Sequence, residues 1–300
     1  MPFTQAQLEE RRKFLGASEA AASVGLSEFF TPYQLYLDKI GMGTPLAETL
    51  PIKVGVALEP LNVELFEAES GLTVTDRQLA VVDKRYAWRR ATLDGRASDG
   101  WLVEAKSSGV WQNWGREEDA VPAGVIYQCQ HQMACCLDAP GVYVPVILAQ
   151  RQHRIYKVVR DAKLIDLLTV GEEEFMQRVA ERAPPEPVNM DDIKIRYPES
   201  SGTKVKATED IVALAYRLAQ TKETRKQLEK VEKDECFEIA AFMKDADELV
   251  DSRGVPLFTH RSHTERRLDV TALRKQHPDI ADMFSPEKPQ RRLLCKIDLE

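Results

Sequence analysis

Apolar residues recur at the spacing of a helix in the first half of the chain. One such stretch covers residues 51–70 and is followed by Gly71, at a position where glycine commonly ends a helix. Its apolar stripe comprises Val54, Leu58, Leu61, Leu65 and Phe66. Residues 122–138 return to this period. The residues before about 40 are also predicted to be helical, with Thr31 as a cap and Pro32 in a first turn.

Short extended runs lie around these helices. Residues 72–82, 86–94 and 99–108 are rich in β-branched and aromatic side chains and are separated by turn-forming residues. We therefore expect an antiparallel meander there. Residues 143–149 and 154–161 predict two more strands. The order of helix, strands, helix and strands predicts an α/β fold with a mixed central sheet flanked by helices.

A change in composition ends this core. Residues 183–192, APPEPVNMDD, are predicted to be neither helix nor strand, and we place a linker at 183–207. The expected domains are therefore 1–182 and 208–300. The second is an α+β extension for which the pattern predicts a long polar helix at 208–244, a hairpin around Arg253 and Gly254, a short helix at 269–277 and a final strand at 291–299.

Composition narrows the classes of protein that fit. A chain of 300 residues with 43% hydrophobic content can bury a sizeable core. No apolar run reaches the roughly 18 residues that a membrane span requires, so we expect an intracellular protein without a membrane partner. The five cysteines form no CxxC pair and are expected to be reduced thiols. The net charge of −7 neither supports nor excludes binding to nucleic acid, because a groove needs only local positive potential.

Three residues at the end of the predicted meander carry the strongest chemical signal. Asp94 closes one strand and Glu104 lies in the next, so a hairpin would place the two carboxylates on neighbouring strands. Such a pair repels unless a cation lies between its members, and hard oxygen ligands favour Mg²⁺ or Mn²⁺. Lys106 shares a strand face with Glu104. The three are the minimum set for metal-assisted hydrolysis of a phosphodiester.

Two further residues extend this set. Glu59, on the helix before the strands, is available as an extra carboxylate, and Gln128, on the helix after them, can orient water or substrate without adding charge. Any one of these acids is by itself more typical of a solvated surface residue. Their joint order along the chain is what favours a site.

The sequence resembles the lambda-exonuclease and YqaJ-type phage recombination nucleases of the PD-(D/E)xK superfamily over about residues 8–180. The segments that carry the resemblance, in the family's order, are RRKFLGASEAAASVGL, GVALEPLNVELFEAESGL, ATLDG, VEAKSS and YQCQHQMA. Leu93 stands where the motif usually has proline. The resemblance implies a nuclease domain at 1–182, with metals bound by Asp94, Glu104 and Glu59, water activated by Lys106, and Gln128 completing the site.

The resemblance also implies how DNA is bound and used. Arg11, with Arg12 as the alternative, and Ser18 resemble a pair that holds a terminal 5′-phosphate, and Thr92 is a further candidate hydroxyl there. A magnesium-dependent 5′ to 3′ exonuclease acting on the ends of double-stranded DNA is expected, in the cytoplasm of a bacterium or phage-infected host. A ring-shaped homo-oligomer and a single-strand annealing partner are expected by the same analogy.

The sequence is also compatible with other functions and offers other candidate contacts. An endonuclease of the same fold, or a catalytically weak DNA-binding or assembly protein built around the long helix, are the competing functions. Trp111 and Trp114 are candidate substrate contacts in a polar loop. Two basic runs on predicted strands are as compatible with a DNA-facing surface as with a solvated one; they contain His260, Arg261, His263, Arg266 and Arg267, and Arg291, Arg292 and Lys296.

Overall fold

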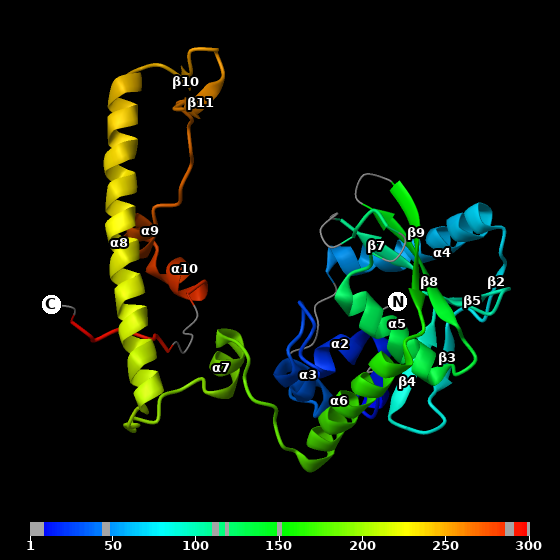
Figure 1. Cartoon of the computed structure of the whole chain (residues 1–300). Coiled ribbons are helices and arrows are strands. Elements are labelled where there is room, and N and C mark those ends of the chain that lie inside the picture. The colour runs from blue at the N-terminus through cyan, green and yellow to red at the C-terminus, as the bar shows by residue number, and fades with distance from the viewer. Residues whose placement is uncertain are drawn as a thin grey trace. The chain divides into compact units, whose positions relative to one another are not determined.

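The structure of the protein is a computed structural model that describes residues 9–43, 49–109, 114–117, 120–148, 152–285 and 291–298. The chain divides into two compact units, Met1–Arg196 and Tyr197–Glu300 (Figure 1). Each unit has its own secondary structure, and the chemistry predicted from the sequence falls in the first.

Helices and strands follow one another in blocks through unit 1. Its helices are η1 (Ala17–Glu19), α2 (Ala20–Ser23), α3 (Pro32–Lys39), α4 (Leu50–Ser70), α5 (Ala123–Cys135), α6 (Ala162–Glu181) and α7 (Met190–Arg196). Its strands are β1 (Leu15–Gly16), β2 (Val74–Thr75), β3 (Leu79–Val82), β4 (Arg89–Leu93), β5 (Gly95–Ala97), β6 (Leu102–Val103), β7 (Lys106–Ser108), β8 (Gly141–Leu148) and β9 (Gln152–Val159).

The strands of unit 1 form two sheets. A mixed sheet has the order β2-β5-β6-β8-β7, with β9 paired to β8, and a smaller sheet has the order β1-β4-β3. β6 and β7 pair in parallel with β8, whereas β9 pairs with it antiparallel. β8 therefore forms the centre of the mixed sheet, which explains why most of its residues are buried.

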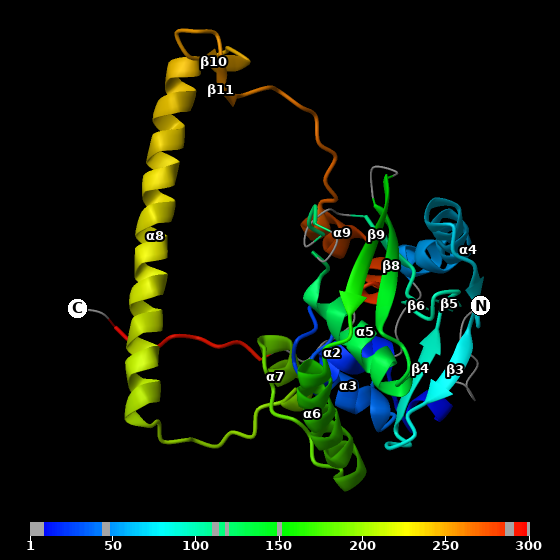
Figure 2. The same cartoon turned by 45° about the vertical axis from the view of Figure 1, so that its right-hand side comes forward.

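Helices cover both faces of the mixed sheet (Figure 2). Along β8, Val142, Val144 and Val146 belong to the cluster of buried residues that includes α5. Tyr143, between them, contacts the cluster formed by α4, β2, β5 and β6. Because side chains alternate across a strand, α5 and α4 lie on opposite faces. The predicted α/β fold with a mixed sheet flanked by helices is confirmed.

The predicted antiparallel meander is wrong in its connections. β3 and β4 pair antiparallel in the small sheet, and β5 and β6 do so in the mixed sheet, but the chain changes sheet between β4 and β5. The strand at 102–108 then takes the later, apolar β8 as its parallel partner. Pairing to a distant strand is decided by burial of that strand, which local turn signals do not report.

Two helical expectations also need correction. The N-terminal helical region is interrupted by β1, where the buried Leu15 donates its N–H to the carbonyl of Trp88 at 2.7 Å. In α4 the predicted apolar stripe is wrong at Val54 and Leu61, which are 42% and 46% exposed, and is confirmed at the buried Phe66. The fully buried residues of α4 are Asn62, Val63 and Phe66.

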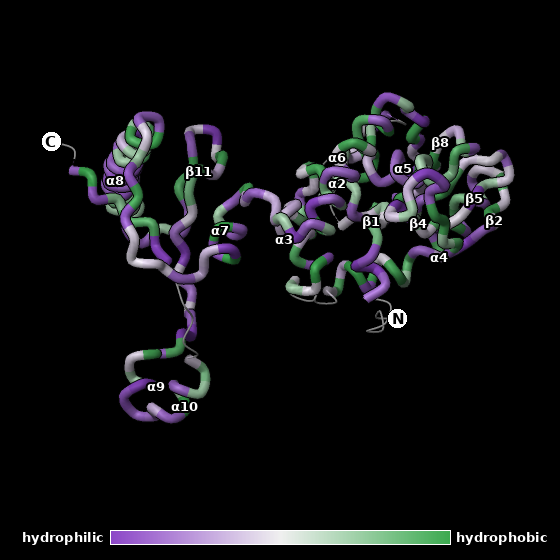
Figure 3. Tube along the Cα trace, turned by 90° about the horizontal axis from the view of Figure 1, so that it is seen from below, coloured by the Kyte–Doolittle hydropathy of each residue, from purple (hydrophilic) through white to green (hydrophobic). Residues whose placement is uncertain are grey.

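Unit 2 is built around one long helix, α8 (Glu209–Met243). A two-stranded antiparallel sheet of β10 (Glu248–Val250) and β11 (Pro256–Thr259) follows, and then α9 (Val270–Gln276) and α10 (Pro278–Met283). Only Ala219 and Met243 of α8 are buried. In Figure 3 both hydrophilic and hydrophobic residues are seen along this helix. The long helix, the hairpin and the short helix are confirmed.

Other predictions near and within unit 2 are not. Residues 291–298 are irregular rather than a strand, and 260–268 are irregular and exposed, so neither basic run lies on the predicted strands. Residues 183–189 are irregular as expected, but α7 begins at Met190, where Asn189 Oδ1 accepts from the N–H of Asp192 at 2.9 Å. Among the helices that the structure describes, none has the length and apolarity needed to cross a bilayer.

Candidate active site

The two central carboxylates meet as the sequence predicts. Asp94 lies between β4 and β5, and β5 pairs antiparallel with β6 so that Gly95 faces Val103. One step further along this hairpin, Asp94 Oδ2 accepts the N–H of Ala105 at 2.9 Å. Asp94 and Glu104 are thereby held on adjacent strands, at the point where the chain passes from the small sheet into the mixed one.

Glu104 and Lys106 lie on one face of a strand whose register does not change. Leu102 pairs with Val142 and Lys106 with Val146, and between them the N–H of Glu104 donates to the Tyr143 carbonyl at 2.9 Å. Strand alternation is therefore kept across the break between β6 and β7. Lys106 Nζ lies 2.7 Å from Glu104 Oε1, which confirms the predicted shared face.

Two glutamines of α5 close the site from one side. Gln128 Nε2 donates to Glu104 Oε1 at 2.6 Å, and Gln128 Oε1 accepts from Lys106 Nζ at 2.8 Å. Gln132 Nε2 donates to the other oxygen, Glu104 Oε2. Gln132 was missed from the sequence, although it lies four residues after Gln128 and so on the same helix face. Its Oε1 is buried without a hydrogen-bond partner in the described part of the chain.

The charges of the site alter the proton affinities of its side chains. Burial and the negative charges of Glu104 and Glu59 raise the pKa of Asp94 to about 8. Burial by itself lowers the pKa of Lys106, but the charge and hydrogen bond of Glu104 and the charge of Asp94 outweigh it, so the pKa is raised. The lysine is therefore a stable cation, and in the absence of a metal Asp94 keeps its proton up to about pH 8.

Glu59 lies near this pair without joining it directly. It is partly buried on α4, and its Oε1 accepts from Gln78 Nε2 at 2.6 Å. Within the described ranges no three histidine, cysteine, aspartate or glutamate side chains converge as a preformed metal centre. The residues nevertheless fit a divalent cation, because two hard carboxylates repel each other and no described residue donates to the buried Gln132 Oε1.

A buried amide connects α4 to the strand that carries the lysine. Asn62 Nδ2 donates to the Lys106 carbonyl at 2.8 Å and to the Pro145 carbonyl at 2.9 Å. Asn62 is 1% exposed, so these carbonyls have no water to replace it. The apolar periodicity of α4 did not predict a role for this residue. Its position beside Val63 and Phe66 on the buried face is the signal that could have found it.

The structure brings the predicted end-binding residues to one neighbourhood. β1 runs parallel to β4 with Gly16 facing Arg90, and two residues further along each chain lie Ser18 and Thr92, both exposed. Arg11 is tied to the same place, because its Nη2 lies 3.5 Å from Oε1 of Glu19 in η1. The alternative, Arg12, has its guanidinium close to Gly41 instead.

A buried lysine holds this N-terminal segment in shape. Lys39 Nζ donates to Glu19 Oε2 at 2.6 Å and to the carbonyls of Arg11 and Phe14 at 3.0 and 2.7 Å. Burial lowers the pKa of Lys39 in spite of the charge of Glu19. Glu19 thus links a buried lysine to Arg11, and neither Glu19 nor Lys39 was identified from the sequence.

A second buried network lies on the opposite face of β4. The Arg89 guanidinium donates to Glu172 Oε2 at 2.9 Å, Asp83 Oδ2 at 3.0 Å and Thr169 Oγ1 at 2.7 Å. Glu172 Oε1 also lies 2.6 Å from Nδ1 of His131 on α5. Asp83, Arg89, Glu172 and His131 have side chains at most 1% exposed. The network joins β4, α5 and α6 behind the candidate site.

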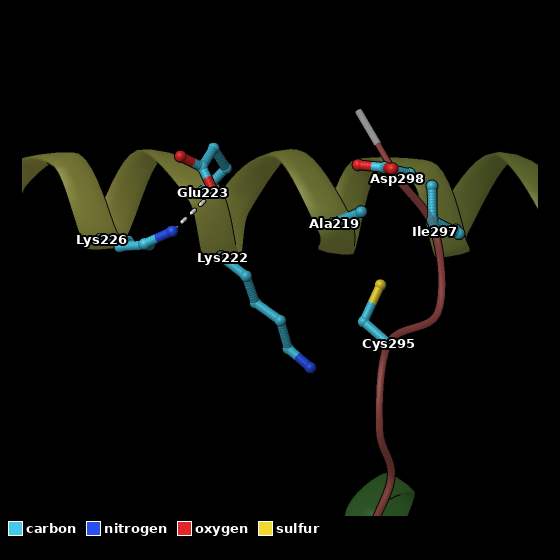
Figure 4. Close-up of a pocket in the computed structure, with 7 residues that line it drawn as sticks. All are labelled: Ala219, Lys222, Glu223, Lys226, Cys295, Ile297 and Asp298. Carbon is cyan, nitrogen blue, oxygen red and sulfur yellow. Dashed lines mark ion pairs between the residues drawn. The ribbon is translucent and has the colours of Figure 1, made fainter. Parts of the chain in front are cut away.

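Two surface pockets lie outside this constellation. In unit 2, a pocket of about 250 Å³ between α8 and residues 291–298 contains Glu223, which pairs with Lys226 at 3.9 Å, and Cys295 (Figure 4). In unit 1, a pocket of about 330 Å³ is lined by Trp114, Gly115, Arg116, Gln152 and Arg154. The pocket of unit 1 has no carboxylate in its described lining, and of the two in unit 2, Glu223 and Asp298, the first pairs with Lys226.

Of the two tryptophans predicted to contact substrate, the structure describes only Trp114. Trp114 is partly buried and its ring centroid lies 5.1 Å from that of Tyr156, so it packs against the core as well as lining a pocket. Trp111 lies outside the described residues. The cysteines are free thiols, as expected, within the part of the chain that the structure describes.

The raised pKa of Asp94 predicts how the metal-free protein responds to pH. A native state that keeps this proton up to about pH 8 gains stability below the ordinary value of 3.8 and loses it as pH rises towards 8. We expect Asp94→Asn to raise the free energy of unfolding by roughly 1–2 kcal/mol at pH 9 and by little at pH 4. Urea unfolding in chelator, followed by tryptophan fluorescence, measures this.

Asp138→Asn is the matched control for that measurement. The Arg96 hydrogen bond lowers the pKa of Asp138, so removing its charge should cost stability at high pH rather than add it. Equal unfolding free energies for Asp94→Asn and wild type at pH 9 would contradict the predicted repulsion.

Comparisons with known proteins show what the chain is similar to. Residues 7–137 match the YqaJ-like viral recombinase domain. The chain is 26% identical to the uncharacterized protein YqaJ of Bacillus subtilis over 301 aligned residues, covering 96% of this chain and 93% of the relative. Both units are therefore within the aligned length.

A solved structure has a similar fold over part of the chain. The crystal structure of an alkaline exonuclease from Laribacter hongkongensis matches with a TM-score of 0.50 at 20% identity, covering 60% of this chain and 94% of that one. The likeness extends to the fold, a mixed sheet with flanking helices, which is consistent with the fold expected from the sequence. Over residues 7–137, the chain is therefore similar to the YqaJ-like viral recombinase domain.

Proposed function

We propose that the protein is a magnesium-dependent exonuclease that hydrolyses linear double-stranded DNA from its 5′ ends in phage-type recombination. The observation that carries the proposal is the contact set of Glu104, Lys106 and Gln128 next to Asp94, with interatomic distances of 2.6–2.8 Å within the set. The likeness to a named alkaline exonuclease supports it. We also infer a DNA-end partner, a homo-oligomer and an annealing protein, as in the family that the sequence resembles.

Asp94 and Glu104 are the residues that would hold the metal, with Glu59 as a further acid. A bound Mg²⁺, or Mn²⁺ in its place, supplies a water of lowered pKa and shields charge on the phosphate. Lys106 orients that water and offers its positive charge to the phosphate oxygens as negative charge builds up on them. The Gln128 amide positions both groups, because it accepts a hydrogen bond from the Lys106 ammonium and donates one to Glu104.

The residues near β1 have the chemistry to bind the end of a DNA strand. The Arg11 guanidinium can bind a terminal phosphate through two donors, and the exposed Ser18 and Thr92 hydroxyls can add single hydrogen bonds. Because Thr92 precedes Asp94 by two residues on the same strand face, a phosphate held there lies about 7 Å from the carboxylate site. This spacing supports removal of nucleotides one at a time from the end.

The test compares linear DNA with the same plasmid as a covalently closed circle. We expect Mg²⁺ and Mn²⁺ to support loss of the linear form only, and Ca²⁺ to support binding without cleavage, because its looser coordination positions water less well. Label released first from the 5′ end rather than the 3′ end establishes the direction. Cleavage of the circle would favour an endonuclease, and no loss of either form would favour a binding or assembly role.

A further inference from the structure

β4 presents two faces of different character. Arg89, Ala91 and Leu93 are 1%, 4% and 1% exposed and point into the core. Arg90, between them, alternates with these residues and shares its face with Thr92 and Asp94, which are not buried. The four residues from Asp94 back to Arg90 cover about 13 Å along the strand. A cation on this face is therefore in line with the carboxylate site but beyond contact with the scissile bond.

The Arg90 guanidinium is held among side chains of the N-terminal segment. It lies over the ring of Phe14, 4.6 Å from the centroid, and Arg90 Nη1 lies 3.0 Å from Glu10 Oε1. The other oxygen of Glu10 lies 2.9 Å from Lys13 Nζ. A carboxylate is thus held between two cations. Hydrogen bonds from Lys13 and then from Arg90 lower the pKa of Glu10, as expected for an anion at a positively charged place.

One donor of this group is left without an acceptor. Arg90 Nε is buried and makes no hydrogen bond to any residue that the structure describes. The Glu10 carboxylate engages a single nitrogen of Arg90, whereas a guanidinium has donors for a bidentate anion. A phosphate has more acceptor oxygens than a carboxylate and can use donors of Arg90 and Lys13 together.

We propose that Arg90 and Lys13 form a binding site for a phosphate of the DNA substrate, and that Glu10 occupies this site when DNA is absent. The proposal rests on the proposed function, in which DNA is the substrate. When a phosphate binds, Glu10 moves aside and the two cations change partner. The Phe14 ring keeps the Arg90 guanidinium on the exposed face of β4 during this exchange.

The test measures DNA affinity without cleavage. Fluorescence anisotropy of a short labelled duplex in chelator is compared for wild type, Arg90→Gln and Lys13→Gln. We expect binding to weaken about tenfold for Arg90→Gln, less for Lys13→Gln, and the salt dependence to fall by about one counterion in each. Arg178→Gln is the control, since it removes the same charge from an exposed ion pair with Glu174 on α6.

Glu10→Gln is expected to change the affinity for DNA in the opposite direction. Removing the competing carboxylate should tighten binding, and this variant keeps both cations in place if Arg90→Gln does not fold. Unchanged affinity for Glu10→Gln, or the same affinity and salt dependence for folded Arg90→Gln as for Arg178→Gln, would overturn the proposal. A wild type that binds DNA but does not hydrolyse it with Mg²⁺ would instead contradict the proposed function alone.

Duplexes with a 5′-phosphate or a 5′-hydroxyl identify the source of the phosphate. A loss for Arg90→Gln that appears only with the phosphorylated end places a terminal phosphate at the site. An equal loss with both ends places an internal backbone phosphate there. Either outcome supports a phosphate site on β4.

Discussion

Lys106→Ala is expected to reduce hydrolysis of linear duplex DNA by about a thousandfold or more while leaving the protein folded. The substitution removes the only cation in contact with Glu104 among the described residues, so the attacking water and the phosphate lose the positively charged side chain proposed to act on them. The Lys106 backbone still pairs with Val146 and Asn62, so strand β7 remains in place. Rates with Mg²⁺ at saturating DNA measure the effect on the chemical step.

Lys163→Ala is the matched control, because Lys163 is an exposed lysine in the first turn of α6. Affinity measured in Ca²⁺ shows whether DNA still binds. If Lys106→Ala retained more than about a tenth of the wild-type rate, the lysine would be no part of the chemistry. If the variant lost binding and rate in parallel, it would act on the substrate complex instead.

Arg89→Met is expected to destabilise unit 1 by about 3–5 kcal/mol. Methionine preserves much of the apolar stem but leaves Asp83 and Glu172 buried without the guanidinium that donates to both. An uncompensated buried charge is more costly than the loss of an exposed ion pair. The melting temperature should fall by roughly 10 °C.

Tryptophan fluorescence reports this change specifically. All four tryptophans, at positions 88, 101, 111 and 114, belong to unit 1, so unfolding of unit 2 contributes little to the signal. Arg178→Met provides the exposed comparison and should cost less than about 1 kcal/mol. A loss for Arg89→Met no larger than this would show that the acids take up protons or water at little cost.

The main part of the candidate site could be predicted because it is local in sequence. Asp94 and Glu104 are joined by a short hairpin, and Glu104 and Lys106 by strand alternation, so turn signals and a period of two are enough to place them together. Gln128 follows from helical periodicity together with the family resemblance. These relations do not depend on the rest of the sheet, which explains why they hold although the predicted meander is wrong.

The remaining features depend on contacts between distant segments. The parallel pairing of 102–108 with β8 requires knowing which apolar run is most buried, and Asn62 is recognisable only when the carbonyls of Lys106 and Pro145 are opposite it. In the sequence Arg89 is not distinguishable from an exposed charged residue of a strand, because its partners Asp83 and Glu172 are recognised only in the folded structure. Burial of polar groups reverses the usual preference and has no local sequence signal.

The prediction of a final strand at 291–299 is wrong for a related reason. Residues 291–298 have the alternation of a strand, but nearly all of them are exposed and no neighbouring strand pairs with them among the described residues. Alternation indicates a strand only where an existing sheet offers an edge. In its described ranges, unit 2 has only the short β10–β11 hairpin for this purpose.

The central position of β8 has a consequence for how the sequence can change during evolution. Its register with β6 and β7 is constant from Val142 to Leu148, so β8 aligns both halves of the strand that carries Glu104 and Lys106. Deleting one residue within β8 would shift its pairing with one half by a residue and exchange buried for exposed side chains. Relatives of this protein should therefore accumulate insertions and deletions in the turns on either side of β8 and almost none within it.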